Sequence, residues 1–408
     1  MADIIAYRAR TMIPLAGEQP ARGEPQLFAP LRRVDDAVLL CADGQVLEAG
    51  RWGSVSLPAG SQVRDLGEVC LAPGLINAHC HLQLSHVAGR TRWGEGFTAW
   101  LRSLVPLLHE DFSQDAVNAA CAAMREAGTA HVGDYAGAGL LLVEQAARAA
   151  GLGISHFCEW FGMAAPFVDA RRPWPPACRA ALEAEGPTPG QPGGDLVAPL
   201  EARCAPAGHA LYSTAPEILQ DARRWCREQG RVFALHLAES PDETELLLDG
   251  RGPLKEFYDG VVLPAGWRAP GLRPLALAVK LGLPGQGTLA VHGTQLDARE
   301  LAVLAASGSA LCLCPRSNAH LGVGLPPLRQ AMESGVLLCL GTDGLSSNTD
   351  LDVRQEALFL REHFDVPPEV LLRLLTVNGA AALQMPALGR LERGMAAHWS
   401  LLPEALCI

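Results

Sequence analysis

The chain has 408 residues, of which 49% are hydrophobic and 19% charged, and its formal net charge is −11. This composition is typical of a globular protein, and no run of 18 or more apolar residues indicates a membrane span. The composition also argues against a nucleic-acid partner, because phosphate binding requires clustered cations and the chain has only two lysines, Lys255 and Lys280.

The first twenty residues lack the basic residues and unbroken apolar run of a secretory signal, so we expect a cytoplasmic protein. The twelve cysteines of the chain are scattered without a CxxC pair, which in that compartment indicates reduced thiols and no disulfide. We expect a small-molecule substrate as the partner, and the sequence leaves open whether the chain forms a homo-oligomer.

Residues 1–70 alternate short apolar runs with Gly, Pro and charged turns, a pattern that predicts β-hairpins. The tail over 386–408 has the same short extended pattern. We therefore expect an accessory β-domain built from 1–70 plus 386–408, at the two ends of the chain.

Residues 71–385 change to apolar runs that alternate with Ala- and Leu-rich helical patterns, such as 115–128 and 217–230, as in parallel α/β folds. The predicted strands lie near 74–81, 129–134, 153–158, 208–213, 231–237, 288–293, 309–314 and 336–343. Eight strand-helix units favour a (β/α)₈ TIM-type barrel as the catalytic domain. A doubly wound open sheet is the alternative.

Three segments look like insertions after the first, third and fifth strands: 88–100, 166–207 and 250–274. Loops at the carboxyl ends of barrel strands build active sites, so these segments are candidates for lids and specificity elements. For 166–207 we favour a plain surface loop, because the segment is rich in Pro, Gly and Ala.

The segment HCHLQLSH places His79 and His81 two residues apart on the first strand. Side chains alternate along a strand, so both imidazoles point into the barrel and can hold one metal ion. On its own this pattern equally fits two polar residues at a strand end. His236, His292 and Asp343, however, each stand where a later apolar run stops, and a barrel brings such strand ends together.

The segments APGLINAHCH, HALYSTAP, HLAES, VHGT, CPRSN and LGTDGLSSN resemble successive signatures of the amidohydrolase superfamily, in particular its branch of deaminases and chlorohydrolases. The resemblance runs from about residue 70 to 385. It implies one divalent metal, zinc by expectation, bound by His79, His81, His236 and Asp343. It also implies that Glu239 and His292 serve proton transfer and polarisation at the reacting centre.

The chemistry agrees with this set, because bound Zn²⁺ lowers the pKa of water to about 7. Asp343 can then take the remaining proton, and Glu239 can shuttle one to the substrate, although a solvated loop position is the alternative for Glu239. Three imidazoles and a carboxylate suit Fe²⁺ or Mn²⁺ as well. A pair of metals bridged by a lysine on the fourth strand is not expected, since HALYSTAP contains none.

His209 matches a histidine that faces the substrate in the relatives, with a structural histidine as the alternative. Trp93, with Phe97 and Trp100, could wall the site, although simple packing is the favoured interpretation of three aromatic residues in a loop. Two stretches, 81–100 and 252–283, resemble the aminodeoxyfutalosine deaminases of menaquinone biosynthesis. The expected reaction is hydrolysis of 6-amino-6-deoxyfutalosine to futalosine and ammonia. Deamination of another aminopurine, a pterin or a triazine, or a metal-binding protein without catalysis, are the alternatives.

The benzoate of that substrate calls for a cation, and with two lysines in the chain we expect an arginine, whose planar fork binds a carboxylate through two hydrogen bonds. The candidates are Arg90 and Arg92 after the first strand, and Arg268 and Arg273 after the fifth. For each of them singly, a solvated surface charge is the favoured interpretation.

Overall fold

The computed structural model describes residues 3–163, 174–185 and 200–408. Across these ranges, no helix combines the length and apolar character that a membrane crossing needs.

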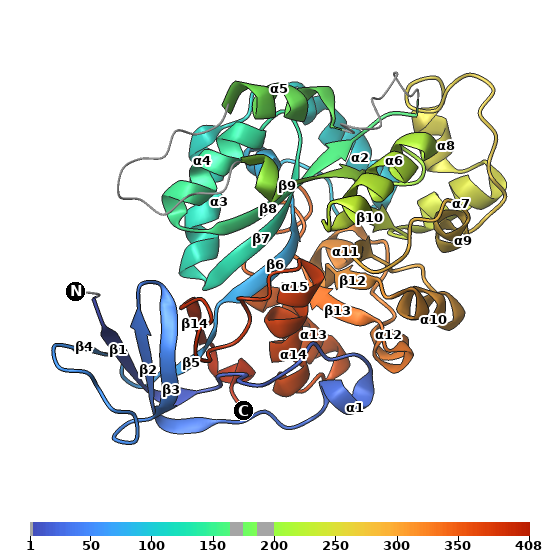
Figure 1. Cartoon of the computed structure of the whole chain (residues 1–408). Helices are drawn as coiled ribbons and strands as arrows, with labels where there is room; N and C mark the ends of the chain where they lie inside the picture. Colours follow the sequence, from blue (N-terminus) through green and yellow to red (C-terminus); the bar gives the residue numbers. More distant parts are fainter. Residues whose placement is uncertain (1–2, 164–173, 186–199) are drawn as a thin grey trace.

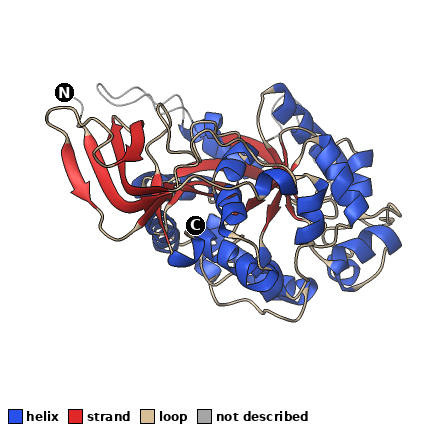
Figure 2. Ribbon diagram, turned by 90° about the horizontal axis from the view of Figure 1, so that it is seen from below, coloured by secondary structure: helices blue, strands red, loops and turns tan. Residues whose placement is uncertain are grey.

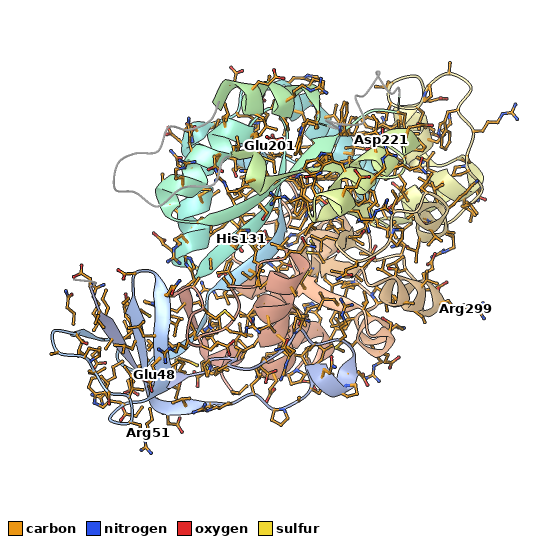
Figure 3. All side chains as sticks on the ribbon, viewed as in Figure 1. Glu48, Arg51, His131, Glu201, Asp221 and Arg299 are labelled. Carbon is orange, nitrogen blue, oxygen red and sulfur yellow. The ribbon has the colours of Figure 1, made fainter. Side chains whose placement is uncertain are left out.

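Both ends of the chain contribute to one six-stranded sheet, in which the strand order is β14-β5-β1-β2-β3 and β4 pairs with β1. Its strands are β1 (Ile5–Met12), β2 (Val34–Ala42), β3 (Gln45–Arg51), β4 (Gln62–Asp65), β5 (Cys70–Pro73) and β14 (Trp399–Leu402). In Figure 1 the red β14 lies beside the blue strands of the N-terminal end. Figure 3 shows Glu48 and Arg51 on this sheet, apart from the rest of the fold. The division into domains at residues 70 and 386 stays a prediction.

The remaining eight strands are parallel and form two four-stranded sheets, β6-β7-β8-β9 and β10-β11-β12-β13. Their bounds are β6 (Leu75–Cys80), β7 (Thr129–Ala136), β8 (Gly153–Trp160), β9 (Cys204–Gly208), β10 (Phe233–Leu237), β11 (Thr288–His292), β12 (Ala310–Leu313) and β13 (Leu337–Leu340). Figure 2 shows the strands running through the molecule with helices packed around them.

Backbone hydrogen bonds connect the two sheets at both edges. After β9, the His209 carbonyl accepts the amide of His236 on β10 at 3.0 Å. After β13, the amide of Thr342 donates to the carbonyl of His79 on β6 at 3.1 Å. This α/β arrangement of parallel strands is consistent with the expected barrel, although the strand ladders form two separate four-stranded sheets.

The helices begin and end at local signals in the sequence. Asp297 and Glu300 form a capping box at the start of α10, and Gly308, at φ 82°, ends that helix in the left-handed conformation. The α-helices are α1 (Glu24–Leu27), α2 (Phe97–Leu104), α3 (Gln114–Glu126), α4 (Leu140–Ala150), α5 (Pro176–Glu185), α6 (Pro216–Glu228), α7 (Pro241–Asp249), α8 (Pro253–Tyr258), α9 (Pro274–Lys280), α10 (Ala298–Ser307), α11 (Pro315–Leu321), α12 (Leu328–Ser334), α13 (Val353–Phe364), α14 (Pro368–Leu375) and α15 (Val377–Ala382). Short 3₁₀ turns are η1 (Leu82–Val87), η2 (Val105–His109), η3 (Leu200–Arg203) and η4 (Glu404–Leu406).

The fourth parallel strand differs from its prediction at 208–213, because β9 covers Cys204–Gly208. The HALYSTAP segment folds as a turn instead, in which the amides of Ser213 and Thr214 both donate to the carbonyl of Ala210. Of the predicted insertions, 88–100 contains the start of α2 and 250–274 contains α8. The insertion at 166–207 lies partly outside the described residues.

Candidate metal and substrate site

A cavity of about 230 Å³ opens beside the carboxyl ends of the parallel strands. Polar side chains line its inner part: His81, Glu159, His209, His236, Glu239, His292 and Asp343. Its outer wall is mainly apolar and includes Leu84, Phe97, Trp100, Leu101, Leu104, Val105, Leu108, Phe161 and Tyr258. The cavity therefore offers a polar floor and an apolar mouth.

The four predicted metal ligands converge at the inner end of this cavity. Asp343 Oδ1 lies 3.4 Å from His79 Nε2 and 3.6 Å from His81 Nε2. His81 Nε2 lies 3.3 Å from His236 Nε2. His79 is fully buried, and His236 and Asp343 are nearly so. The fold thus brings together side chains that are up to 264 residues apart in the chain.

Unusual backbone conformations aim two of the inner side chains into the cavity. His292 and Asp343 end or follow their strands at φ values of 75° and 59°, in the left-handed region that residues with a side chain rarely adopt. Such conformations cost about 1–3 kcal/mol each and persist where the surroundings fix them. Their occurrence at both strand ends indicates a functional constraint on this face.

The hydrogen bonding of the imidazoles leaves ring nitrogens available to bind an ion. His236 Nδ1 must donate to the His209 carbonyl at 2.9 Å, so its Nε2 carries a lone pair toward His81 Nε2. Both ring nitrogens of His79 are buried without a hydrogen-bond partner among the described residues. Burial and the neighbouring His79 lower the pKa of His81 to about 4, which keeps its ring neutral. Neutral imidazoles beside a carboxylate fit a divalent metal ion.

Asp343 is held as an ionised carboxylate. Its Oδ2 accepts hydrogen bonds from Ser317 Oγ at 2.7 Å and Ser347 Oγ at 2.8 Å. Burial favours the neutral carboxyl, but the adjacent imidazoles of His79 and His81 outweigh it and hold the pKa of Asp343 well below its usual range. The two serines stand in the CPRSN and LGTDGLSSN segments, yet sequence reasoning did not give them a role.

Glu239 and His292 face each other, with Glu239 Oε1 3.6 Å from His292 Nε2. The amide of Asn318 donates to His292 Nδ1 at 3.1 Å, which leaves the ring proton on Nε2, toward Glu239. Burial, followed by the charges of Asp343 and Glu243, raises the pKa of the Glu239 carboxyl well above its usual range. Glu239 is therefore suited to carry a proton.

A second carboxylate fixes the turn that presents Glu239. Glu243 accepts the backbone amides of Ala238 at 3.2 Å and Glu239 at 2.8 Å. Ser240 Oγ in turn accepts the amide of Glu243 at the start of α7. The Ser-x-x-Glu spacing of a helix start is visible in the sequence and could have identified Glu243 as a positioning residue.

The structure places His209 on the cavity wall, where its Nδ1 pairs with Ser213 Oγ at 2.5 Å. Burial lowers the pKa of His209 to about 3 and keeps the ring neutral. Trp93, by contrast, does not line the cavity. Its Nε1 donates to the Ser346 carbonyl at 3.0 Å and its ring stacks on His320, so it fastens the loop after η1.

The predicted arginines also lie away from the cavity. Arg90 is exposed and forms a two-fold ion pair with Glu110, at 2.6 and 2.7 Å. Arg92 and Arg268 are exposed as well, and Arg273 is paired with Glu300. Within the described part of the chain, the cavity lining includes neither arginine nor lysine. An arginine partner for a substrate carboxylate therefore stays a prediction, and Arg90 and Arg273 are already paired with glutamates.

Sequence reasoning missed Glu159, which lines the cavity from β8. Its Oε1 lies 3.6 Å from His236 Nδ1 and has no hydrogen-bond partner among the described residues. Burial, followed by the charges of Asp343 and Asp134, raises its pKa to about 8. The sequence signal that could have identified Glu159 is an acidic residue inside the otherwise apolar run ISHFCEW.

Gly341 lets β13 approach β6 next to the predicted metal ligands. A Cβ on this residue would lie 2.7 Å from His79 Cβ and 2.8 Å from His79 N, which is closer than such atoms come. We expect Gly341→Ala to displace His79, to destabilise the fold by about 1–3 kcal/mol and to reduce metal affinity at least about tenfold. Metal analysis of the purified variant and its thermal unfolding test this.

The matched control is Gly282→Ala, where φ is 72° and no atom lies within 4 Å of the added Cβ. It should lose stability through backbone strain and keep its metal. Full metal content in Gly341→Ala would contradict the expectation.

Comparisons with known proteins place this site in context. A model of the amidohydrolase family matches residues 70–403. The 5-methylthioadenosine/S-adenosylhomocysteine deaminase of Nitratidesulfovibrio vulgaris is 28% identical over 398 residues, which cover 90% of this chain and 80% of that protein.

Two solved structures are similar in fold. The aminofutalosine deaminase of Helicobacter pylori in complex with methylthio-coformycin has a TM-score of 0.80 at 20% identity, over 99% of this chain and 93% of that chain. An adenosine deaminase of Xanthomonas campestris with bound zinc has a TM-score of 0.74 at 21% identity, over 97% and 83% of the two chains.

Proposed function

The chain belongs to the amidohydrolase family, and from that premise we propose that it is a metal-dependent deaminase of adenine-type nucleosides. It is a hydrolase that acts on carbon-nitrogen bonds. The observation that carries the proposal is the convergence of Glu239, His292 and Asp343 within 4.8 Å of one another, next to the histidine cluster. The names of the relatives support it, since they act on nucleosides with an adenine base.

We propose one metal centre in which His79, His81, His236 and Asp343 are the ligands. Zinc is the expected ion, in keeping with the zinc of the Xanthomonas campestris deaminase, while the ligand atoms also suit Fe²⁺ or Mn²⁺. An ion bound there would act as a Lewis acid and lower the pKa of a bound water molecule to about 7.

The side chains of the site then carry out the proton transfers of a hydrolytic deamination. Asp343, whose Oδ2 accepts hydrogen bonds from two serine hydroxyls, accepts a proton from the attacking water. The Glu239 carboxyl protonates the ring nitrogen next to the reacting carbon, and the Nε2 proton of His292 stabilises negative charge on the oxygen that forms. Asp343 then passes its proton to the amine, which leaves as ammonia, and the added hydroxyl returns a proton to Glu239 as it becomes the ring carbonyl.

The specific substrate that we propose is 6-amino-6-deoxyfutalosine, supported by the likeness in fold to the Helicobacter pylori enzyme. Its aromatic arm suits the apolar mouth formed by residues such as Leu104, Leu108 and Phe161, with its carboxylate in water beyond them. The same mouth, without an arginine or lysine among the described residues, favours 5′-methylthioadenosine as a second candidate.

An ammonia-release assay on the purified zinc form tests the substrate. We expect kcat/KM for 6-amino-6-deoxyfutalosine to exceed that for adenosine at least about tenfold, because only the former fills the apolar mouth. A higher value for 5′-methylthioadenosine would reverse the order of the two candidates. Equal values for all three nucleosides would mean that the mouth does not select, and activity on none of them would refute the proposed function.

A further inference from the structure

Glu159 is an inward-facing side chain near the end of β8, and nothing in the proposed proton transfers uses it. Its side chain is 15% exposed, and the Oε1 atom is buried without a hydrogen-bond partner among the described residues. The nearest ring nitrogen, His236 Nδ1 at 3.6 Å, already donates to the His209 carbonyl at 2.9 Å. The local structure therefore leaves this carboxylate oxygen unsatisfied.

Leaving a buried polar atom unpaired is unfavourable, and the cavity beside Glu159 is where a partner can enter. A carboxyl group has an oxygen that accepts hydrogen bonds whether or not the group carries a proton. A partner with an O–H or N–H group therefore satisfies it. A ligand of the cavity meets that requirement if one of its donors reaches the β8 side.

The position of Glu159 separates it from Glu239. Glu159 groups with His209 and His236, whereas Glu239 groups with His292 and Asp343. β8 belongs to one four-stranded sheet, and β11 and β13 belong to the other. A substrate whose amine-bearing carbon lies at Glu239 consequently presents a different part of itself to Glu159.

We propose that Glu159 is a substrate-binding residue that accepts a hydrogen bond from a sugar hydroxyl of the nucleoside. This inference rests on the proposed function. The only N–H donors of an adenine base are those of the amine lost at the reacting centre, so the hydroxyl groups of the sugar are the donors that remain. Glu159 thereby selects ribonucleosides over substrates that lack the hydroxyl, such as a free base.

The test pairs Glu159→Leu, which removes both acceptor oxygens, with adenosine and with two substrates that each lack one hydroxyl, 2′-deoxyadenosine and 3′-deoxyadenosine. For adenosine we expect kcat/KM of the variant to fall about tenfold to a hundredfold, mainly through KM, as when a buried hydrogen-bonding group loses its partner. For the deoxynucleoside that lacks the recognised hydroxyl, wild type should already be low, and the variant should be lower by no more than about twofold.

Glu228→Gln on the exposed end of α6 is the matched control and should behave as wild type on all three substrates. Metal content and thermal unfolding of both variants show whether the site is intact. If Glu159→Leu folds poorly, Glu159→Ala serves in its place and should show the same dependence on the hydroxyl. Glu159→Gln, which keeps an acceptor oxygen, should lose less than either.

Equal losses on all three nucleosides would overturn the inference, because Glu159 would then act on the base or on the fold. An unchanged KM for adenosine would overturn it too. If wild type deaminates none of the three nucleosides or any other adenine-type nucleoside, the proposed function itself fails and this inference fails with it.

Discussion

Glu239→Gln is expected to lower kcat at least about a hundredfold while the protein keeps its metal, because positioned acid-base groups contribute about a hundredfold to ten-thousandfold. Glutamine preserves the shape of the side chain and cannot deliver the proton. Glu239 is buried, faces His292 Nε2 at 3.6 Å and has a pKa raised by burial, so it holds a proton that the substrate ring requires. Steady-state kinetics with metal analysis of the same preparation measures both quantities.

Two outcomes would contradict this role. Loss of metal from Glu239→Gln would mean that Glu239 is a ligand, and an unchanged rate would mean that it takes no part. Glu228→Gln again serves as the control, because its side chain lies on the exposed end of α6.

Removal of the metal with a chelator is expected to lower activity at least about a thousandfold, since the pKa of free water is 15.7 rather than about 7. Added Zn²⁺ should restore the rate. The apoprotein should also unfold at a lower temperature, because an ion that binds only the native state stabilises it by about 4 kcal/mol at a thousandfold excess over its Kd. Kinetics and calorimetry before and after chelation test this, and full activity of a protein free of metal would refute the metal centre.

The sequence predicts those parts of the fold that depend on neighbouring residues, through apolar periodicity and the signals at helix ends. Seven of the eight parallel strands lie within a few residues of their predicted positions, and the amidohydrolase resemblance is confirmed by the family match. The strand before His209 was placed too late, because CAPAG is short and contains a proline, whereas HALYSTAP looks more strand-like. The CAPAG segment is a strand because it pairs with β8 in the folded protein.

The site was predictable where a residue type and its position carry the chemistry, as for His79 at the end of the first strand. It was not predictable where a contact decides the role. Arg90 had the correct charge and the correct loop, but Glu110, twenty residues later, neutralises it at the surface. In the sequence Glu159 is a single acidic residue in an apolar strand. The three-dimensional structure shows that its Oε1 lies beside the cavity without a hydrogen-bond partner among the described residues.

The edges where the two four-stranded sheets meet have a consequence for the order in which the protein matures during synthesis. The edge beside the metal ligands joins Asn77 to Thr342 by a hydrogen bond across 265 residues. A growing chain on the ribosome can therefore present His79 and His81 long before Asp343 exists. Because the proposed metal centre includes Asp343, we expect it to be complete only after β13 has left the ribosome and docked on β6.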